Sequence, residues 1–239
     1  MGDSVISVVI PVFNEEANLR PLCEELRFHL ERISRPYEVI LVDDGSTDGT
    51  AASLREISCQ WDRLRFLRFR RRCGQTAALD AGFRASRGDV VVTMDGDLQN
   101  DPADLPGLLD RLSGCDAVVG WRAVRRDSWV KRVSSRIANS VRNRLSGDQI
   151  RDTGCSMKAY RRHCLERLPL FDGMHRFLPT LIRMEGFRVE EIQVNHRFRV
   201  HGQTKYNIRN RLFRSFLDLL AVRWMRNRKL RYEILENDS

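Results

Sequence analysis

Short runs of apolar residues alternate with longer amphipathic stretches along the first half of the chain. The apolar runs are continuous rather than interrupted at every second position, as expected for strands buried on both faces of a parallel sheet. They predict strands at residues 4–11, 37–43, 64–69, 89–95 and 116–121. The stretches between them have helical spacing and predict helices at 15–33, 50–61, 74–86 and 102–113. We therefore expect an α/β fold with a mostly parallel, doubly wound sheet and helices on both of its faces.

The composition bounds the class of protein. A chain of 239 residues can form one large domain or a domain with an appendage. Its six cysteines are scattered without a C-x-x-C pair, which argues against a disulfide scaffold or a structural zinc site and fits a reducing cytosol. The N-terminal residues lack the basic lead and the small-residue cleavage site of a signal peptide.

Charge is distributed unevenly between the two halves of the chain. Residues 1–120 contain 14 Arg and 20 acidic residues, a net charge of −6, whereas residues 121–239 contain 27 basic and 12 acidic residues, a net charge of +15. The basic half indicates a polyanionic partner, such as a phosphate compound, a nucleic acid or an anionic membrane surface. A solvated basic surface without a partner is the alternative.

Polar residues gather at the ends of four predicted strands, where the sequence reads PVFNEE, VDDGSTD, MDGDLQ and GWR. Ligands of open α/β sheets bind outside the carboxyl ends of the strands, so these residues are the first candidates for a site. The chain contains neither a G-x-G-x-x-G turn nor a G-x-x-x-x-G-K-[ST] loop. This argues against a nicotinamide-dependent enzyme and against a P-loop hydrolase.

The strand at 89–95 ends in two aspartates, Asp95 and Asp97, with Gln99 next on the same alternation. Two carboxylates and an amide oxygen suit a hard divalent cation, whose remaining coordination positions can bind phosphate oxygens. An ordinary turn is the alternative, since Asp and Gly are both favoured in turns. We interpret this stretch as a metal site that holds a phosphate group.

Four stretches occur in order along the chain: VVIPVFNEEANL, VILVDDGSTDGT, GQTAALDAGFRASRGDVVVTMDGDLQNDP and RDTGCSMKAYRR. Together they resemble the family 2 glycosyltransferases of the GT-A fold, and most closely the polyprenyl-phosphate branch that includes the dolichyl-phosphate mannose synthases. The resemblance covers residues 5 to about 208. It implies a Rossmann-like sheet and an inverting, metal-dependent transfer of a hexose from a UDP- or GDP-sugar to undecaprenyl or dolichyl phosphate.

The resemblance also implies roles for individual residues on the donor side. The residues similar to the family's base and ribose pocket are Pro11, Phe13, Glu15, Val42 and Asp44. The metal site would bind Mg²⁺ or Mn²⁺ through Asp95, Asp97 and Gln99, with Gly96 against the donor.

The donor diphosphate would be bound further along the chain. FRVHGQTKYN is similar to the family's Arg-x-x-Gly-x-Ser-Lys-Tyr stretch, with Thr204 in place of the serine. It supplies Arg199 and Lys205 as phosphate-binding cations, and Arg176 in HRFLP is a further candidate for the same diphosphate.

Asp152 in RDTGCS lies where relatives with hydroxyl acceptors carry their general base. A lipid monophosphate, with a second pKa of about 6, is already largely ionised at neutral pH and needs no strong base. We therefore expect Asp152 to orient the acceptor or a cation. The alternatives are a glycosyltransferase with a hydroxyl (glycan) acceptor that uses Asp152 as its base, and a turn-capping aspartate. The predicted catalytic residues are Asp97, Asp152, Arg199 and Lys205.

Two basic stretches in the second half are amphipathic. In the first, apolar residues recur every four positions at Trp129, Val133, Ile137, Val141 and Leu145. In the second, one face is predicted to hold Ile208, Leu212, Phe216, Leu219, Leu220 and Trp224. Such helices suit the plane of an anionic membrane interface, with packing against the sheet or a partner chain as the alternative. The predicted contacts to the acceptor phosphate are Arg122, Arg132 and Arg136.

We expect a catalytic domain at 1–206, with a nucleotide-binding half at 1–121 and an acceptor-binding half at 122–206, followed by an interface tail at 207–239. The longest uncharged stretch after residue 207 falls far short of the roughly 20 residues that a membrane span requires. We therefore expect a cytoplasmic protein, peripheral at the inner face of the membrane. A separate membrane subunit and self-association are open as partners.

Two other classes of protein fit parts of the sequence. Phosphohydrolases of the haloacid dehalogenase type also carry D-x-D after a strand, but after their first strand, whereas here the motif follows the fourth predicted strand. A non-enzymatic protein that binds nucleic acid or another polyanion would use the basic half. Aromatic residues do not interleave with the arginines as base-stacking platforms would, so we expect no nucleic-acid partner.

Overall fold

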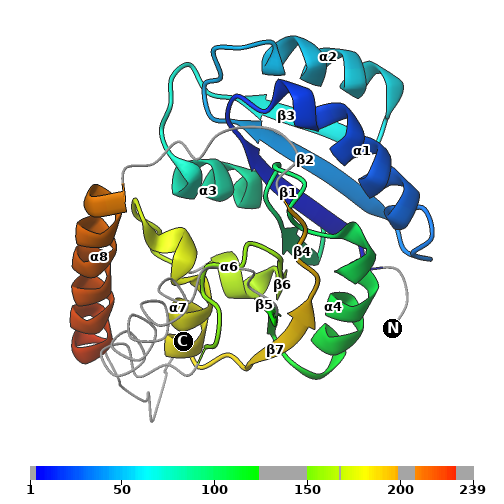
Figure 1. Ribbon diagram of the computed structural model, residues 1–239. Helices are drawn as coiled ribbons and strands as arrows, with labels where there is room; N and C mark the ends of the chain where they lie inside the picture. The colour runs from blue at the N-terminus through cyan, green and yellow to red at the C-terminus, as the bar shows by residue number, and fades with distance from the viewer. Residues whose placement is uncertain (1–3, 124–149, 167, 199–207, 230–239) are drawn as a thin grey trace, which may run out of the picture.

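A computed structural model describes residues 4–123, 150–166, 168–198 and 208–229, with side chains described from residue 216 onward in the last range. Within these ranges a single seven-stranded sheet carries helices on both faces (Figure 1). In chain order the elements are β1 (Ile6–Val12), α1 (Glu16–Leu30), β2 (Tyr37–Asp43), α2 (Thr50–Gln60), β3 (Leu64–Arg68), α3 (Gln75–Ala85), β4 (Val90–Thr93), α4 (Leu105–Arg111), β5 (Ala117–Arg122), β6 (Lys158–Arg161), α6 (His163–Glu166), α7 (Leu178–Met184), β7 (Val189–Val194) and α8 (Ile208–Arg228).

The strands follow the spatial order β3-β2-β1-β4-β6-β5-β7. All neighbouring pairs are parallel except those of β6, which runs antiparallel to both β4 and β5. The carboxyl ends of the parallel strands therefore share one edge of the sheet with the first residue of β6, Lys158, which is opposite Thr93. The predicted mostly parallel sheet is confirmed, and the five predicted strands correspond to β1 to β5. The strands β6 and β7 were not predicted.

One face of the sheet is covered by α1, α2 and α4 (Figure 1). These helices bury apolar stripes against strand residues that are themselves almost inaccessible. The fully buried side chains on this face include Ile6, Val8, Ile10, Leu19, Leu22, Leu26, Leu54, Leu105 and Leu108. The helical spacing seen in the sequence is the spacing of these inward positions.

The opposite face is covered by α3, α6 and α7, and α8 packs beside them through the same apolar cluster (Figure 1). Val9, Ile40, Val42 and Val119 point from the strands into this second cluster. The sheet therefore separates two apolar layers, as the continuous apolar runs of the strands predict.

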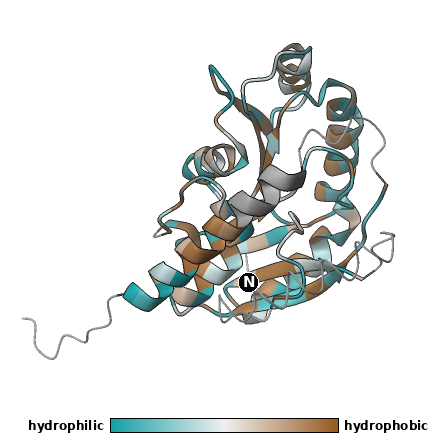
Figure 2. Cartoon of the chain, turned by 60° about the vertical axis from the view of Figure 1, so that its left-hand side comes forward, coloured by the Kyte–Doolittle hydropathy of each residue, from teal (hydrophilic) through white to brown (hydrophobic). Residues whose placement is uncertain are grey.

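The helix α8 has apolar residues on two sides. Leu219 and Val222 are buried in the second cluster, whereas Phe216, Leu217, Leu220 and Trp224 are 48%, 48%, 41% and 64% exposed. The prediction placed Leu219 on the same face as the exposed residues and was wrong there, because α8 packs on the core through Leu219. Figure 2 shows apolar residues along the middle of α8 and hydrophilic residues at its end. No helix among the described residues has the length and apolar character of a membrane span.

The turn after β2 requires glycine at one position. Gly45 has φ +71°, a conformation that L side chains rarely adopt. A Cβ atom there would lie 2.4 Å from the carbonyl carbon of Arg71, so the loop before α3 passes directly over this turn. The buried Asp43 carboxylate supports the turn, since its Oδ1 accepts a hydrogen bond from the backbone N–H of Ser46 at 2.8 Å.

Replacing this glycine tests how tightly the two loops are packed. We expect Gly45→Ala to lower the free energy of unfolding by about 2–5 kcal/mol, because it adds both backbone strain and a steric clash. Gly186→Ala is the matched control, since Gly186 also has positive φ but no atom within 4 Å of the added Cβ. The control should lose only about 1–2 kcal/mol. Equal losses in urea denaturation would contradict the close approach of the two loops.

Candidate functional site

The loops after β1 and β2 are joined by hydrogen bonds. The backbone N–H of Asn14 donates to Ser46 Oγ at 2.9 Å, and Asn14 Oδ1 accepts from the backbone N–H of Thr47 at 2.8 Å. The Glu15 backbone N–H donates to Thr50 Oγ1 at 2.9 Å, while its carboxylate accepts from Asn18 Nδ2 at 2.6 Å. Glu15, predicted for the donor pocket, therefore has a local structural contact through its side chain.

The carboxylate of Asp44 holds the loop that precedes α3. Its oxygens accept hydrogen bonds from the backbone N–H groups of Cys73 at 2.6 Å and of Gly74 at 2.9 Å. The same loop places the Arg72 guanidinium 4.3 Å from the centroid of the Phe13 ring. The structure thus brings Phe13 and Asp44 together beside the loop before α3. That loop also carries Arg72, which was not predicted as a site residue.

Two other residues predicted for donor binding have little exposed surface. Val42 is 0% exposed and packs in the second cluster, so its side chain offers no surface to a ligand. Gly96 is also buried, and a Cβ there would lie 2.8 Å from Val12 Cγ1. Glycine at 96 therefore lets the loop after β4 pass close to β1.

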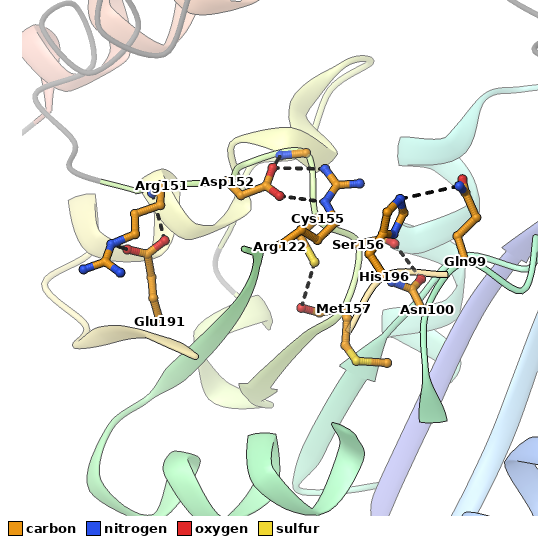
Figure 3. Close-up of polar contacts among 11 residues, drawn as sticks. Gln99, Asn100, Arg122, Arg151, Asp152, Cys155, Ser156, Met157, Glu191 and His196 are labelled. Atoms are coloured by element: carbon orange, nitrogen blue, oxygen red, sulfur yellow. Dashed lines mark hydrogen bonds and ion pairs between the residues drawn. The ribbon is translucent and has the colours of Figure 1, made fainter. Parts of the chain in front are cut away.

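That loop, residues 94–101, carries the predicted metal ligands and is held by Asn100. Asn100 Oδ1 accepts a hydrogen bond from Ser156 Oγ at 2.8 Å (Figure 3). It also accepts one from the backbone N–H of Asp95 at 2.8 Å. Leu98 has φ +63° while its side chain is buried in the first cluster. A buried leucine rarely adopts this backbone conformation, so the surrounding contacts determine the shape of the loop.

The two aspartates of this loop influence each other. Asp97 is 7% exposed. Burial raises the pKa of the Asp95 carboxyl, and the negative charge of Asp97 raises it further. Asp95 Oδ1 accepts a hydrogen bond from Gln75 Nε2 at 2.9 Å. This bond stabilises the ionised carboxylate of Asp95, but the pKa is raised nonetheless. A divalent cation would relieve the repulsion between the carboxylates, so this donor set fits a hard metal ion.

The chain beyond β7 returns to this loop. The imidazole Nε2 of His196 lies 3.5 Å from the amide nitrogen of Gln99 (Figure 3). The backbone N–H of Arg197 donates to the Gln99 carbonyl at 2.9 Å. Arg197 then forms ion pairs with Asp101 at 2.7 Å and Glu25 at 2.6 Å. His196 is therefore a further candidate ligand for a cation at Gln99. The sequence analysis missed it because the two residues are 97 positions apart.

Asp152 and Arg122 form a two-pronged ion pair at the end of β5 (Figure 3). Arg122 Nε donates to Asp152 Oδ2 at 2.7 Å, and Nη2 donates to Oδ1 at 3.1 Å. Asp152 Oδ1 also accepts from the backbone N–H of Gly154 at 3.2 Å. The pair holds the ionised carboxylate in place, and a proton added to it would compete with these three hydrogen bonds.

A cavity of about 900 Å³ opens between this edge and the helices of the second face. Of the predicted site residues, Pro11, Asp95 and Arg176 line it. Its walls are formed by the loop before α3, the start of the loop after β4, the segment around Asp152, the turn before α7, and α8. The polar and charged lining residues are Arg72, Gln75, Thr93, Asp95, Thr153, Ser156, Lys158, Asp172, His175, Arg176 and Asp218.

Lys158, which lines this cavity, was also missed by the sequence analysis. Its side chain is nearly inaccessible, and Nζ donates to the backbone carbonyl of His175 at 3.3 Å. Burial lowers the pKa of the Lys158 ammonium to about 8. The turn that carries His175 is fixed in turn by Thr76, whose hydroxyl lies 2.8 Å from His175 Nδ1 and accepts from the backbone N–H of Gly173.

Four predicted site residues lie outside the described residues. They are Arg132, Arg136, Arg199 and Lys205. The amphipathic stretch predicted around 129–145 also lies outside them.

The chain resembles known proteins over most of its length. Residues 7–168 match the family model Glycosyl transferase family 2. Dodecaprenyl-phosphate galacturonate synthase of Rhizobium johnstonii is 40% identical over 232 residues, which cover 95% of this chain and 68% of that protein. Undecaprenyl-phosphate 4-deoxy-4-formamido-L-arabinose transferase of Aeromonas hydrophila is 37% identical, with 85% of this chain and 63% of that protein covered. The chain thus spans about two thirds of the length of these relatives.

Solved structures share the fold. Glucosyl-3-phosphoglycerate synthase from Mycobacterium tuberculosis, in complex with Mn²⁺, UDP and phosphoglyceric acid, aligns with a TM-score of 0.71 and 22% identity. The alignment covers 93% of this chain and 78% of that one. The predicted GT-A-like α/β fold and the resemblance to family 2 are thereby confirmed.

Removing the Asn100 side chain tests what holds the loop at residues 94–101. Asn100→Ala leaves the Asp95 N–H and the Ser156 hydroxyl without their acceptor, and we expect it to lower the free energy of unfolding by about 1–3 kcal/mol. Asn195→Ala is the control, since Asn195 is exposed and, among the described residues, its side chain bonds to Asp104 alone, at 3.1 Å. Urea denaturation in metal-free buffer measures both variants. An Asn100→Ala protein as stable as the control would show that other contacts hold the loop.

Proposed function

The chain belongs to glycosyl transferase family 2, and on this premise we propose that it transfers a sugar from a nucleotide-sugar to a polyprenyl phosphate. The observation that carries the proposal is the pair of carboxylates Asp95 and Asp97, of which Asp95 lines a cavity of about 900 Å³. Two relatives are named for dodecaprenyl and undecaprenyl phosphate. Because the chain spans only part of the length of these relatives, its own donor and acceptor are part of the proposal.

The metal site is proposed at Asp95, Asp97 and Gln99, with His196 as a further ligand. Mg²⁺ or Mn²⁺ bound there would neutralise charge that develops on the departing nucleoside diphosphate. The residues of the chain prepare this site: Asn100 fixes the loop, and Gln75 orients the Asp95 carboxylate. The neighbouring synthase was crystallised with UDP and with either Mn²⁺ or Mg²⁺.

The nucleoside is proposed to bind beside the loops after β1 and β2. Phe13 and Arg72 form a stacked pair there, and Asp44 fixes the loop that carries Arg72. Pro11 lines the cavity on the same side, and Arg176 lines it from the turn before α7. We propose that Arg176 binds the donor diphosphate, and we propose the same role for Arg199 and Lys205 from the motif alone.

A phosphate acceptor suits the Arg122–Asp152 pair better than a hydroxyl acceptor. A hydroxyl must lose a proton as it attacks, and Asp152 would have to receive that proton while bound to Arg122 by two hydrogen bonds. A phosphate monoester is already ionised and needs no base. Arg122 Nη1 makes no hydrogen bond to the described residues, so the guanidinium retains a donor group for an acceptor phosphate.

We place the enzyme against the inner face of the cytoplasmic membrane. Leu217 lines the cavity and lies in the exposed apolar row of α8, with Phe216, Leu220 and Trp224. Arg223 and Arg228 are exposed on the same helix. Aromatic and aliphatic residues beside arginines suit an anionic interface. The free state of all six cysteines suits a reducing compartment.

The metal assignment is tested at Asp97. Asp97→Asn removes one charged ligand while keeping the size of the side chain, and we expect metal-dependent transfer to fall at least about 100-fold. Asp110→Asn, an exposed position on α4, is the control and should retain full activity. Isothermal titration with Mn²⁺ should show weakened binding for Asp97→Asn alone. Full activity and unchanged Mn²⁺ affinity would refute the assignment.

The class of acceptor is tested at Asp152. With polyprenyl phosphate as acceptor, we expect Asp152→Asn to reduce kcat by only about tenfold and to leave the pH dependence of kcat unchanged, because no base is removed. Loss of a general base would cost about 100- to 10,000-fold and would abolish the acidic limb of the pH profile. That second result would favour a hydroxyl acceptor. Circular dichroism checks that loss of the ion pair leaves the fold intact.

A further inference from the structure

Lys158 places a buried positive charge at the edge of the sheet where the parallel strands end. It is the first residue of β6 and pairs with Thr93 at the end of β4. Only 4% of its surface is exposed, and what is exposed lines the cavity between Asp95 and the turn that carries His175. The charged groups around it are Asp95, Asp152 and Arg122. Lys158 thus lies within electrostatic range of both the proposed metal site and the proposed acceptor site.

This ammonium group is poorly satisfied by the protein. It can donate three hydrogen bonds, but its single acceptor among the described residues is the His175 carbonyl at 3.3 Å. It forms no ion pair with a carboxylate of the described residues. A buried cation without a close counter-charge is costly, and proteins normally pair it.

The neighbouring carboxylates are committed to other groups. Asp152 is bound by Arg122 through both of its oxygens. Asp95 accepts from Gln75 and belongs to the proposed metal site. A ligand that enters the cavity is therefore the group available to supply a negative charge to Lys158.

We propose that Lys158 binds an anionic oxygen group of a substrate inside the cavity, either the carboxylate of a uronic-acid donor sugar or the phosphate of the acceptor. This inference rests on the proposed function and adds a residue that selects between charged and neutral substrates. Both sources present the same chemistry, an oxyanion that can accept the remaining ammonium protons. The donor diphosphate, which we propose to bind at the metal site and at Arg176, is distinguished from these two sources by the binding of UDP alone.

The test compares Lys158→Met, which keeps length without charge, with Lys158→Arg, which keeps the charge. Lys229→Met is the control, because Lys229 pairs with Glu185 at 3.2 Å and does not line the cavity. Titration calorimetry with Mn²⁺ measures the Kd of UDP, of UDP-galactose and UDP-galacturonic acid, and of GDP-mannose and GDP-mannuronic acid. Each sugar pair differs only in a hydroxymethyl group against a carboxylate. Transfer assays give the KM for polyprenyl phosphate.

Two results support the proposal and distinguish its sources. If the sugar carboxylate is the ligand, the wild type prefers one uronic-acid donor over its neutral partner. Lys158→Met then lowers the ratio of the two Kd values at least about tenfold. If the acceptor phosphate is the ligand, the donor ratio stays unchanged and KM for polyprenyl phosphate rises at least about tenfold. In both cases Lys158→Arg retains part of the effect and UDP binds all variants equally.

Other results overturn it. Unchanged donor ratios together with an unchanged acceptor KM would show that Lys158 binds no substrate anion. Weakened binding of UDP itself by Lys158→Met would assign the lysine to the diphosphate instead. We expect the thermal midpoint of Lys158→Met to equal or exceed that of the wild type, since an unpaired buried charge is removed, and a lowered midpoint with unchanged binding would indicate a purely structural lysine. A wild type that binds no nucleotide would refute the proposed function, and this inference with it.

Discussion

Burial of Asp95 beside Asp97 costs free energy that a nearby positive charge can offset, and the loops around this pair are built to maintain that arrangement. Asn100 connects this loop to Ser156 by a hydrogen bond. Leu98 has an unfavourable backbone conformation while its side chain is buried in the core. The parallel strands bring the other loops to the same edge. The site is therefore a consequence of strand direction combined with two closely spaced carboxylates.

The first half of the fold could be predicted from the sequence because its strands are buried on both faces and read as continuous apolar runs. The strands β6 and β7 could not. The first is only four residues long and begins with a lysine, and the second carries two glutamates at a sheet edge. The position of Leu219 was also mistaken, because a helix with apolar residues on two sides does not reveal which side faces the core.

The motifs predicted candidate residues for the chemistry, but not the residues that contact them. Asp95, Asp97 and Asp152 stand out by local spacing, whereas His196 and Lys158 reach the same edge through long-range packing. Such contacts leave no local pattern. The structure adds that Arg122 and Asp152 are bound to each other, which makes a pre-ionised acceptor the better match. Leu217, one of the exposed apolar residues of α8, also lines the cavity, and we propose that a lipid acceptor approaches on this side.

We propose that this edge of the sheet transfers a sugar from a nucleotide to a lipid phosphate. The most direct test incubates the full chain with radiolabelled UDP- and GDP-sugars, Mg²⁺ or Mn²⁺ and a short-chain polyprenyl phosphate, and follows label into organic solvent. We expect metal-dependent transfer from one donor and none from the same donor with EDTA. Metal-dependent binding of a nucleotide-sugar without any label in the lipid phase, in the presence of membranes as well as without them, would contradict the lipid phosphate as acceptor.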